Sequence, residues 1–401
     1  MTGTDILAAD RLAKAFTPNR PIDLPQLLSG RLDLLYRLQD IINTQGQHAI
    51  LYGDRGVGKT SIARVLAILS QEPSEPNGNR AILISCDSRD DYASLWRKIF
   101  QEVLLAERQL GFGTSQAAAI VGRWNPDTSS IMSPNDVRLL IGGLLHHMVI
   151  VIDEFDRIPN DSDACRLMAD TIKLFSDMNT RCTLILVGVA DSIGDLIAEH
   201  QSISRNIAQV PVDVMSSPEL AQIIQKGYGS AGLEFDADLA NRCAFLSQGY
   251  PHYTHLLGLW TGRKAIERGS KRVTAEDLEA AIPTAIENTA GGIQLEYDVA
   301  TDSNQPDNLF KPVLLACALA DKDARGRFGV ASLRDPLQRI LNRPVIRAVA
   351  YQSHLAKFCE DSHGPVLRRS GTRRNYRWQF INPQLIPFVR LQGLRSGLLA
   401  E

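Results

Sequence analysis

Paired cysteines and long hydrophobic runs are both missing from this sequence of 401 residues. Its six cysteines are scattered, and their spacing matches neither a Cys-x-x-Cys motif nor a Cys/His zinc site. The apolar runs, such as residues 148–152, are far shorter than the roughly 20 residues that span a bilayer. Residues 1–16 are polar and mixed, unlike a signal peptide. We therefore expect a cytoplasmic protein with reduced thiols and no membrane segment.

The net charge is close to zero overall, but charge is unevenly distributed along the chain. The net charge is −2, yet residues 305–401 carry 16 Lys and Arg against 7 Asp and Glu, a charge of +9. The rest of the chain therefore carries −11. A basic region of this kind indicates either contact with a polyanion or docking on an acidic neighbouring subunit.

Short apolar runs alternate with helical patterns in the first half of the sequence. The runs are flanked by polar or glycine-rich turns, and most are rich in Val and Ile. Strands that are buried on both faces of a parallel sheet have this continuous apolar character. The alternation predicts an α/β fold with a parallel sheet sandwiched by helices. The predicted strands are residues 48–52, 81–86, 148–152, 183–189 and 210–214.

Helical patterns replace the strands after residue 216, and a hairpin pattern follows near the end. Four predicted helices form a small helical domain, and a polar linker follows them. Three further helices and a hairpin around residues 370–372 then make the pattern of a winged helix. We predict a P-loop core over residues 1–215 with a lead-in over 1–47, a helical lid over 216–290, a linker over 291–307 and a winged-helix domain over 308–401. The helices are predicted at residues 218–227, 236–248, 251–268, 274–286, 308–319, 330–341 and 344–359, and the hairpin strands at 364–369 and 375–380.

A complete phosphate-binding motif follows the first predicted strand. Residues 53–60 match G-x-x-x-x-G-K-S/T and precede a predicted helix at 61–69. Glycines let successive backbone N–H groups point at phosphate oxygens, and the helix N-terminus adds a positive dipole. Lys59 is expected to reach the β- and γ-phosphates of ATP, and the Thr60 hydroxyl to bind Mg²⁺. The predicted nucleotide-binding residues are Gly53, Asp54, Arg55, Gly56, Val57, Gly58, Lys59, Thr60 and Ser61.

Two acids end the third predicted strand. Asp153 and Glu154 follow the apolar residues 148–152, which is the Walker B pattern. Asp153 is expected to hold Mg²⁺, and Glu154 to orient and deprotonate the attacking water. Asp156 and Arg157 follow closely, and we expect them to form ion pairs on the surface and not to belong to the site. Together with the phosphate loop, the acids predict a Mg²⁺-dependent ATPase.

These motifs, in this order, resemble the AAA+ superfamily, and most closely its branch of origin-recognition initiators and related STAND ATPases. The resemblance covers about residues 16–388 and includes residues 16–18 and 29–31, which look like a lead-in that packs on adenine. Residues 248–253 resemble the G-x-P turn of the helical lid, and residues 376–383 the end of the winged helix. The resemblance implies a homo-oligomer or a hetero-oligomer with ATP bound at the interfaces between subunits.

The same resemblance implies further site residues. Asp191 is the candidate for sensor 1, which contacts the γ-phosphate or the water, and Ser192 is the alternative. An N-cap for a helix over 193–199 would explain Asp191 equally well. Arg205 is the candidate arginine finger, with an ordinary surface arginine as the alternative.

The sequence departs from the initiator pattern at two places. Initiators usually carry Asn at sensor 1 and an Arg in the lid, whereas this chain has Asp191 and no lid arginine in the turn. Pro251 and His252 are the nearest candidates for contact with the nucleotide in place of that arginine. The alternative is that His252 simply faces solvent. These departures favour a slow, switch-like ATPase.

The basic C-terminal domain contains candidate contacts to double-stranded DNA. The third helix of a winged helix enters the major groove, and arginines around the hairpin suit phosphate contact. The alternative is that the winged helix docks a protein, as many do. The DNA-binding candidates are Arg347, Tyr351, His354, Arg368, Arg369, Arg373, Arg374 and Arg377.

The leading interpretation is an ATP-controlled AAA+ protein whose nucleotide state governs oligomerisation and DNA binding through the winged helix. The alternative is a STAND-like signalling switch, in which ATP locks an oligomer and the winged helix docks protein partners. The charge of +9 favours the first interpretation. The G-x-P turn without a lid arginine favours the second.

Overall fold

The computed structural model of the chain describes residues 3–22, 25, 28–71, 78–109, 132–159, 163–189, 205–303, 305, 308–323, 325–343, 345, 347–372 and 375–399. The chain divides into two compact units. The central unit is Arg20–Asp213, and the discontinuous unit combines Met1–Asn19 with Val214–Glu401. None of the described helices is long and apolar enough to cross a membrane.

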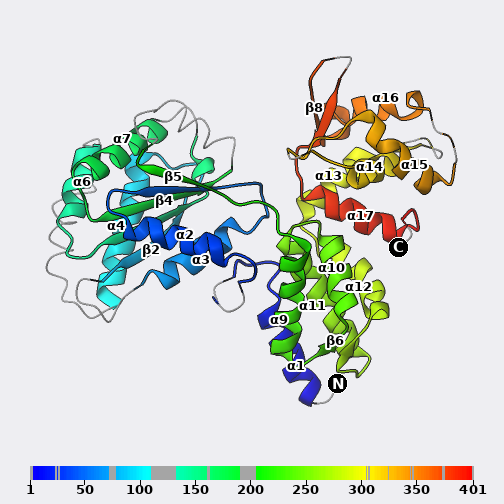
Figure 1. The fold of residues 1–401 in the computed structure, drawn as a ribbon, viewed down its shortest axis with the longest axis horizontal. Helices are drawn as coiled ribbons and strands as arrows, with labels where there is room; N and C mark the ends of the chain where they lie inside the picture. Colours follow the sequence, from blue (N-terminus) through cyan, green and yellow to red (C-terminus); the bar gives the residue numbers. More distant parts are fainter. Residues whose placement is uncertain are drawn as a thin grey trace. The chain divides into compact units, whose positions relative to one another are not determined.

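A five-stranded parallel sheet forms the middle of the central unit (Figure 1). The strand order is β2-β3-β4-β1-β5. Tyr52 of β1 pairs with Gly188 of β4, and Ser85 of β2 pairs with Asp153 of β3, so the carboxyl ends of these strands share one edge. The strands are β1 (His48–Tyr52), β2 (Arg80–Ser85), β3 (Met148–Asp153), β4 (Cys182–Gly188) and β5 (Ile207–Pro211).

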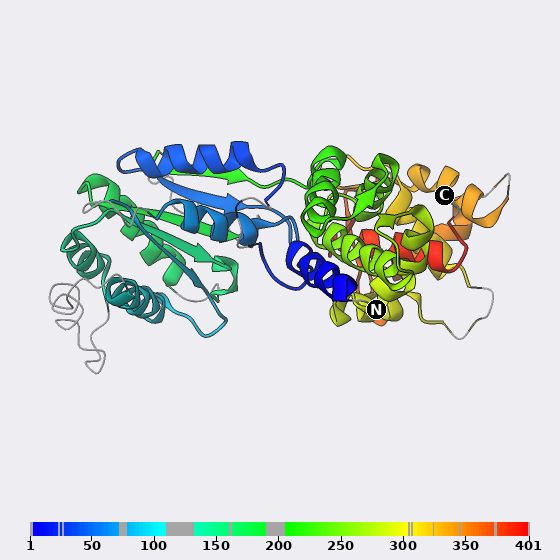
Figure 2. The same ribbon diagram turned by 90° about the horizontal axis from the view of Figure 1, so that it is seen from below.

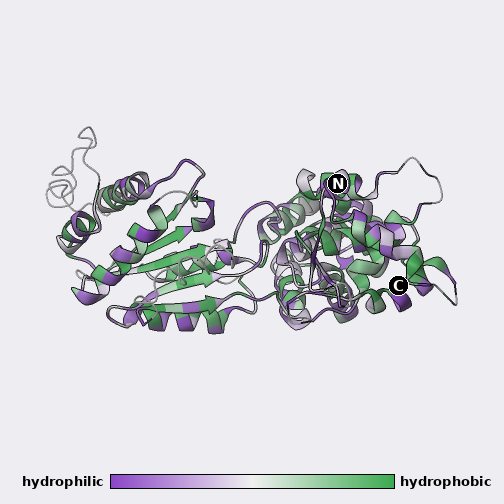
Figure 3. Ribbon diagram, turned by 90° about the horizontal axis from the view of Figure 1, so that it is seen from above, coloured by the Kyte–Doolittle hydropathy of each residue, from purple (hydrophilic) through white to green (hydrophobic). Residues whose placement is uncertain are grey.

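Helices cover both faces of this sheet. On one face, α4 (Tyr92–Gln109), α6 (Pro134–Gly142) and α7 (Ala164–Asp177) share a hydrophobic core with alternate strand residues. The alternate strand residues that point to the other face are equally buried. The helices α2 (Leu32–Asn43) and α3 (Lys59–Leu69) contact the sheet on that face. Figure 2 shows α2 running along the sheet, and Figure 3 shows the strands of the sheet as mostly hydrophobic. The predicted P-loop α/β fold is confirmed.

Four helices and the start of the chain form a bundle in the discontinuous unit. The helix α1 (Gly3–Ala15) packs on the first and third of these helices. Capping boxes that pair Ser216 with Glu219 and Thr274 with Asp277 begin the first and the last. The four are the predicted lid helices, and they are α9 (Ser217–Ala231), α10 (Ala237–Ser247), α11 (Pro251–Glu267) and α12 (Ala275–Glu287).

Phe16 attaches the start of the chain to this bundle. Its ring is 1% exposed and lies 5.3 Å from the ring of Tyr228. A Cβ atom at Gly227 or Gly258 would collide with the Phe16 ring, so both glycines are needed for the ring to fit. The resemblance placed this segment against adenine, but the Phe16 ring fills the bundle core and cannot face a nucleotide.

The C-terminal region follows the order predicted for a winged helix. Three helical segments precede an antiparallel hairpin, and Phe328 adds a single bridge to Trp378. Trp378 is buried and belongs to the core beneath the hairpin. The elements are α14 (Phe310–Leu319), α15 (Arg334–Leu341) with the preceding turn η4 (Val330–Leu333), α16 (Val349–Lys357), β8 (Leu367–Ser370) and β9 (Arg377–Phe380).

Several details differ from the sequence-based predictions. The linker predicted over residues 291–307 contains a helix, α13 (Gly291–Thr301), whose Tyr297 packs on Phe388. The helix α17 (Leu385–Arg395) was not predicted. Residues 1–19 group with the lid bundle instead of the core, because α1 packs on α9 and α11.

Candidate nucleotide-binding site

The loop between β1 and α3 has a backbone that only glycine permits at two positions. A Cβ atom at Gly53 would collide with the carbonyl oxygen of Val212, which follows β5. Gly58 is the N-cap of α3 and has a φ of 96°, a left-handed conformation that costs other residues about 1–2 kcal/mol. The glycines of the motif thus let the loop pack on β5 and turn into the helix.

Lys59 lies inside this loop. Its Nζ atom donates hydrogen bonds to the carbonyl oxygens of Gly53 at 2.8 Å and Asp54 at 2.7 Å. Burial lowers the pKa of Lys59, and the negative charges of Asp156 and Asp153 oppose this shift. The ammonium group is therefore held at the mouth of the loop by partners that a phosphate can replace.

Asp153 and Thr60 bring two oxygen ligands together. Asp153 ends β3 and is 3% exposed, and the Thr60 hydroxyl hydrogen-bonds its carboxylate. Burial raises the pKa of Asp153, and the hydrogen bond from Thr60 opposes the shift. Two oxygen donors of this kind fit Mg²⁺, a hard cation that takes one or two protein ligands and completes its shell with phosphate and water.

These residues surround one pocket of about 440 Å³ at the carboxyl edge of the sheet. Its walls come from the loop after β1, from the end of β3 and the turn after it, and from the end of β4. The lining residues are Arg55, Gly56, Lys59, Thr60, Asp153, Glu154, Asp156, Arg157, Gly188 and Val189. The structure therefore brings Lys59, Thr60, Asp153 and Glu154 to one place, as their positions after parallel strands predicted.

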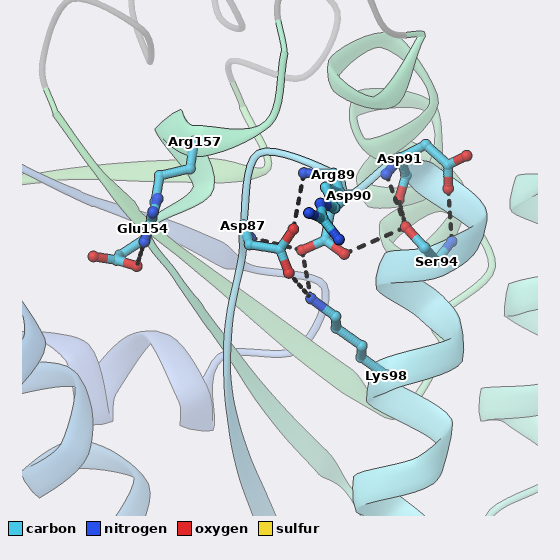
Figure 4. Close-up of polar contacts among 8 residues, drawn as sticks. All are labelled: Asp87, Arg89, Asp90, Asp91, Ser94, Lys98, Glu154 and Arg157. Atoms are coloured by element: carbon cyan, nitrogen blue, oxygen red, sulfur yellow. Dashed lines mark hydrogen bonds and ion pairs between the residues drawn. The ribbon is translucent and has the colours of Figure 1, made fainter.

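Glu154, which lines this pocket, forms an ion pair with Arg157 (Figure 4). Its Oε2 atom lies 2.8 Å from Nη1 of Arg157, and both side chains are about half exposed. The backbone of Glu154 has a φ of 55°, and its N–H donates to Oδ1 of Asp153 at 2.9 Å. Arg157 is thus part of the site, a role that sequence reasoning missed although its i,i+3 spacing from Glu154 was visible.

A second polar network follows the neighbouring strand β2 (Figure 4). Lys98 of α4 donates to the carboxylates of Asp87 and Asp90, each at 2.7 Å. Asp156, also missed as a site residue, accepts a hydrogen bond from the N–H of Val189 at 3.2 Å. The bonds of Lys98 fix the turn after β2 to α4, and the bond of Asp156 joins the turn after β3 to the end of β4.

Other predicted residues of the central unit lie elsewhere. Arg205 precedes β5 and is exposed, at the amino edge of the sheet and thus at the opposite end from the phosphate loop. The Ser61 hydroxyl accepts a hydrogen bond from the N–H of Ile22 at 3.1 Å. Asp191 and Ser192 fall outside the described residues.

Pro251 and His252 begin α11 in the discontinuous unit. Nδ1 of His252 lies 2.8 Å from the carbonyl oxygen of Pro18, so this nitrogen carries the proton. Burial lowers the pKa of His252, which favours the neutral ring. Its Nε2 is buried and has no hydrogen-bond partner within the described residues, so contact of His252 with the nucleotide stays a prediction.

The predicted DNA-binding residues divide into exposed and buried groups. Arg347, Arg368, Arg369 and Arg377 are exposed, and Arg369 lies 4.5 Å from the ring centre of Tyr376. Arg373 and Arg374 fall outside the described residues.

The two predicted contacts on the third helix are less accessible. Tyr351 is 1% exposed and donates to the carbonyl oxygen of Val330, so its prediction as a DNA contact is wrong. His354 is half-buried against Phe310, with 4.8 Å between the ring centres.

The sequence of the central unit matches a known family. Residues 42–196 match the family model described as AAA domain. This part of the chain is an AAA domain. The AAA domain includes β1, the phosphate loop and both acids after β3, so the resemblance to the AAA+ superfamily is confirmed for the nucleotide site. No curated protein sequence matches the chain significantly.

The fold around the AAA domain is similar to several solved structures. The ORC2 protein of Aeropyrum pernix, solved as ADPNP–ADP complexes, is 15% identical over 96% of this chain and 97% of its own, with a TM-score of 0.54. A Walker-type ATPase of Pyrococcus abyssi is 15% identical over 94% and 99% of the two chains, with a TM-score of 0.52. The A. pernix ORC1 protein, solved in complex with DNA, is 17% identical over 96% and 97%, with a TM-score of 0.50. At these identities the likeness is one of fold, and it extends beyond the AAA domain to the lid and the C-terminal region.

Proposed function

We propose that this protein is a Mg²⁺-dependent ATPase whose nucleotide state controls oligomerisation and the binding of double-stranded DNA by its C-terminal region. The observation that carries the ATPase part is the pocket that joins Lys59, Thr60, Asp153 and Glu154. A phosphate loop, a pair of metal ligands and an acid beside them are the parts that ATP hydrolysis needs.

Each of these residues has a distinct task in hydrolysis. Lys59 and the loop amides bind the phosphate oxygens, while Thr60 and Asp153 hold Mg²⁺, which neutralises phosphate charge when it is bound. Glu154 orients the attacking water and takes its proton. Oε2 of Glu154 is paired with Arg157 at 2.8 Å, which holds the carboxylate in one orientation. This ion pair supports a slow enzyme.

The position of Arg205 supports assembly. Because Arg205 lies at the amino edge of the sheet, it is separated along the strands from the phosphate loop of its own chain. An arginine finger at this position acts in a neighbouring subunit. The ATP site would then be complete only in an oligomer.

The charge of the C-terminal region supports contact with DNA. Arg368 and Arg369 on β8 and Arg377 on β9 are exposed on one short hairpin, and Arg347 is exposed just before α16. No acidic side chain forms an ion pair with these arginines among the described residues. Unpaired guanidinium groups of this kind suit phosphate contact.

Glu154→Gln tests the ATPase activity. We expect phosphate release to fall by about 10²–10³-fold while ATP affinity is retained, because only the proton acceptor is lost. Glu102→Gln, an exposed glutamate on α4, is the matched control and should leave turnover unchanged. Unchanged turnover in Glu154→Gln would disprove the assignment of the base.

A STAND-like switch that docks proteins is the second candidate. Val345 and Val349 are 77% and 79% exposed beside Arg347, and apolar side chains at this place favour a protein surface over a DNA groove. The salt dependence of DNA binding separates the two functions. Contact with several phosphates makes affinity fall steeply with salt, whereas a protein-docking surface gives no specific DNA binding to titrate.

A further inference from the structure

The phosphate loop carries an arginine whose side chain the loop motif does not explain. Arg55 stands at the third position of the motif, where any side chain is accepted because only the backbone faces the phosphates. Asp54 and Arg55 are both exposed, and the chain turns directly after them at Gly56, which has a φ of 81°. Of these two side chains, only Arg55 lines the nucleotide pocket.

The other residues of the pocket indicate which part of ATP lies beside Arg55. Lys59 is suited to the β- and γ-phosphates, and a Mg²⁺ ion on Thr60 and Asp153 bridges the same two groups. Glu154 lies where water attacks the γ-phosphate. These four residues line the same pocket as Arg55. Arg55 therefore lies at the end of the pocket that suits the γ-phosphate.

The electrostatics of the loop agree with this position. Burial is the main cause that lowers the pKa of Lys59, and the positive charge of Arg55 lowers it further. The guanidinium group of Arg55 thus acts on the same place as the ammonium group of Lys59. A phosphate bound there meets both charges.

The three positive side chains of the pocket differ in what already holds them. Lys59 donates to two carbonyl oxygens of the loop, and Arg157 is paired with Glu154 at 2.8 Å. Arg55 forms no ion pair with any acid in the described part of the chain. Its guanidinium group can therefore turn to a phosphate without losing a partner.

An arginine at this place suits the chemistry of the γ-phosphate. Hydrolysis spreads negative charge over the oxygens of the phosphoryl group that is transferred. A guanidinium group can donate two parallel hydrogen bonds to such oxygens. A contact that becomes stronger as this charge develops raises the rate more than it raises the affinity for ATP.

We propose that Arg55 contacts the γ-phosphate of ATP in the site of its own chain and stabilises the negative charge that develops there during hydrolysis. This inference rests on the proposed ATPase function. It also makes Arg55 a residue that distinguishes ATP from ADP, because ADP lacks the phosphate that this side chain contacts. Arg205, at the opposite edge of the sheet, can serve only the site of a neighbouring subunit.

The affinities of Arg55→Ala for ATP and for ADP test the contact. With Mg²⁺ present, calorimetry should show an ATP affinity about tenfold lower and an unchanged ADP affinity, because only a contact to the γ-phosphate is lost. The retained ADP affinity also shows that the variant is folded. Arg64→Ala, which removes an exposed arginine of α3 outside the pocket, is the control and should change neither affinity. An unchanged ATP affinity in Arg55→Ala, or an equal loss for ATP and ADP, overturns the proposal.

Turnover tests the role of Arg55 in hydrolysis. Phosphate release by Arg55→Ala at saturating ATP should fall by about a hundredfold, the size of effect expected when one donor to a developing negative charge is removed. If the parent protein releases phosphate and Arg55→Ala does so equally fast, the inference on Arg55 fails alone. If the parent protein releases none, the ATPase proposal fails, and the ratio of ATP to ADP affinity still tests Arg55.

A mixture of two slow variants tests whether Arg55 acts in its own chain. In mixed oligomers of Arg55→Ala and Glu154→Gln, each of the two residues is intact in one kind of subunit, but no subunit has both. We therefore expect phosphate release no higher than the sum of the two variants measured separately. Release well above this sum shows that Arg55 serves a neighbouring site and overturns the assignment to its own chain.

Discussion

The AAA domain and the C-terminal region present their functional candidates in different ways. In the AAA domain, Lys59, Asp153 and Glu154 follow parallel strands and line one pocket. In the C-terminal region, Arg368, Arg369 and Arg377 are exposed on a hairpin, and helix packing decides which residues of the third helix reach solvent. A pocket built on strand ends can therefore be inferred from motifs, whereas a binding surface depends on tertiary packing. The predictions below test this contrast, from the largest expected effect to the smallest.

Lys59→Ala should separate the two regions most clearly. We expect ATP affinity to fall by about a thousandfold, because two charge-assisted contacts to phosphate are lost. DNA binding without nucleotide should be unchanged. Lys173→Ala, which removes an exposed lysine of α7, is the control for ATP binding measured by calorimetry. If Lys59→Ala binds ATP as tightly as the parent protein, the assignment of this pocket as the ATP site is wrong.

Substitution of Arg368, Arg369 and Arg377 by Glu should weaken DNA binding and leave ATP binding unchanged, the opposite of Lys59→Ala. Duplex DNA affinity should fall by about a hundredfold, and the slope of log affinity against log salt should decrease by about 3, since about one counterion is released per phosphate contact. ATP affinity should be unchanged. Reversal of Arg11, Arg20 and Arg64, which are exposed and lie outside the hairpin, is the control with equal charge. DNA affinity that falls equally in both variants indicates a general charge effect and not a hairpin site.

Acidification should weaken both units, with His48 and His255 as the histidines of largest effect. Burial lowers the pKa of His48 in β1 to about 3 and of His255 in α11 to about 4. The unfolded chain, with a histidine pKa near 6.5, binds more protons at pH 5, so stability is full above about pH 6.5 and falls as pH decreases. From pH 7 to pH 5 the expected loss is about 2 kcal/mol per histidine.

Hydrogen exchange resolved by peptide measures this loss in each unit separately. His48→Gln should reduce the pH dependence only in the central unit, and His255→Gln only in the discontinuous unit. Glutamine can still accept the hydrogen bonds that Leu184 N–H and Thr17 N–H donate to the two imidazoles. A pH dependence that neither variant alters shows that other groups cause it.

Arg157→Ala should have the smallest effect, and it should be a gain. Removal of the arginine frees Glu154, and an exposed ion pair contributes no more than about 1 kcal/mol. We therefore expect turnover to rise about two- to fivefold in a phosphate-release assay, with ATP affinity unchanged. Arg166→Ala, which breaks an exposed i,i+3 pair with Asp163, is the matched control. A lower rate in Arg157→Ala assigns the arginine a supporting role in catalysis instead.

The strands and the phosphate loop were predictable from the sequence because their signals are local. Buried parallel strands are apolar along their length, and the loop motif leaves only one arrangement for Gly53 and Lys59. Glu154 was predicted as the base by its place after β3, but its ion pair with Arg157 was not, because it depends on the left-handed turn at Glu154. Asp191 and Ser192 fall outside the described residues, so sensor 1 stays a prediction.

The third helix of the C-terminal region shows where sequence reasoning failed. Apolar side chains occur on both of its faces, so periodicity alone could not choose the buried one. The structure buries Tyr351, Leu355 and Phe358 and exposes Val349, because Phe310 of α14 packs on this side. The helix α13 was missed for a related reason. Its sequence has only a weak helical pattern, and the helix is stabilised by tertiary packing of Tyr297 on Phe388.

The insertion of the central unit between α1 and α9 has a consequence for synthesis on the ribosome. Phe16 leaves the exit tunnel early, but Tyr228, Gly227 and Gly258, which enclose its ring, are translated some two hundred residues later. Leu12 and Phe16 of the first segment therefore stay exposed until the whole central unit and then α9 and α11 have been synthesised. A nascent chain of this protein therefore displays an apolar segment for most of its translation, which is the kind of segment that chaperones bind.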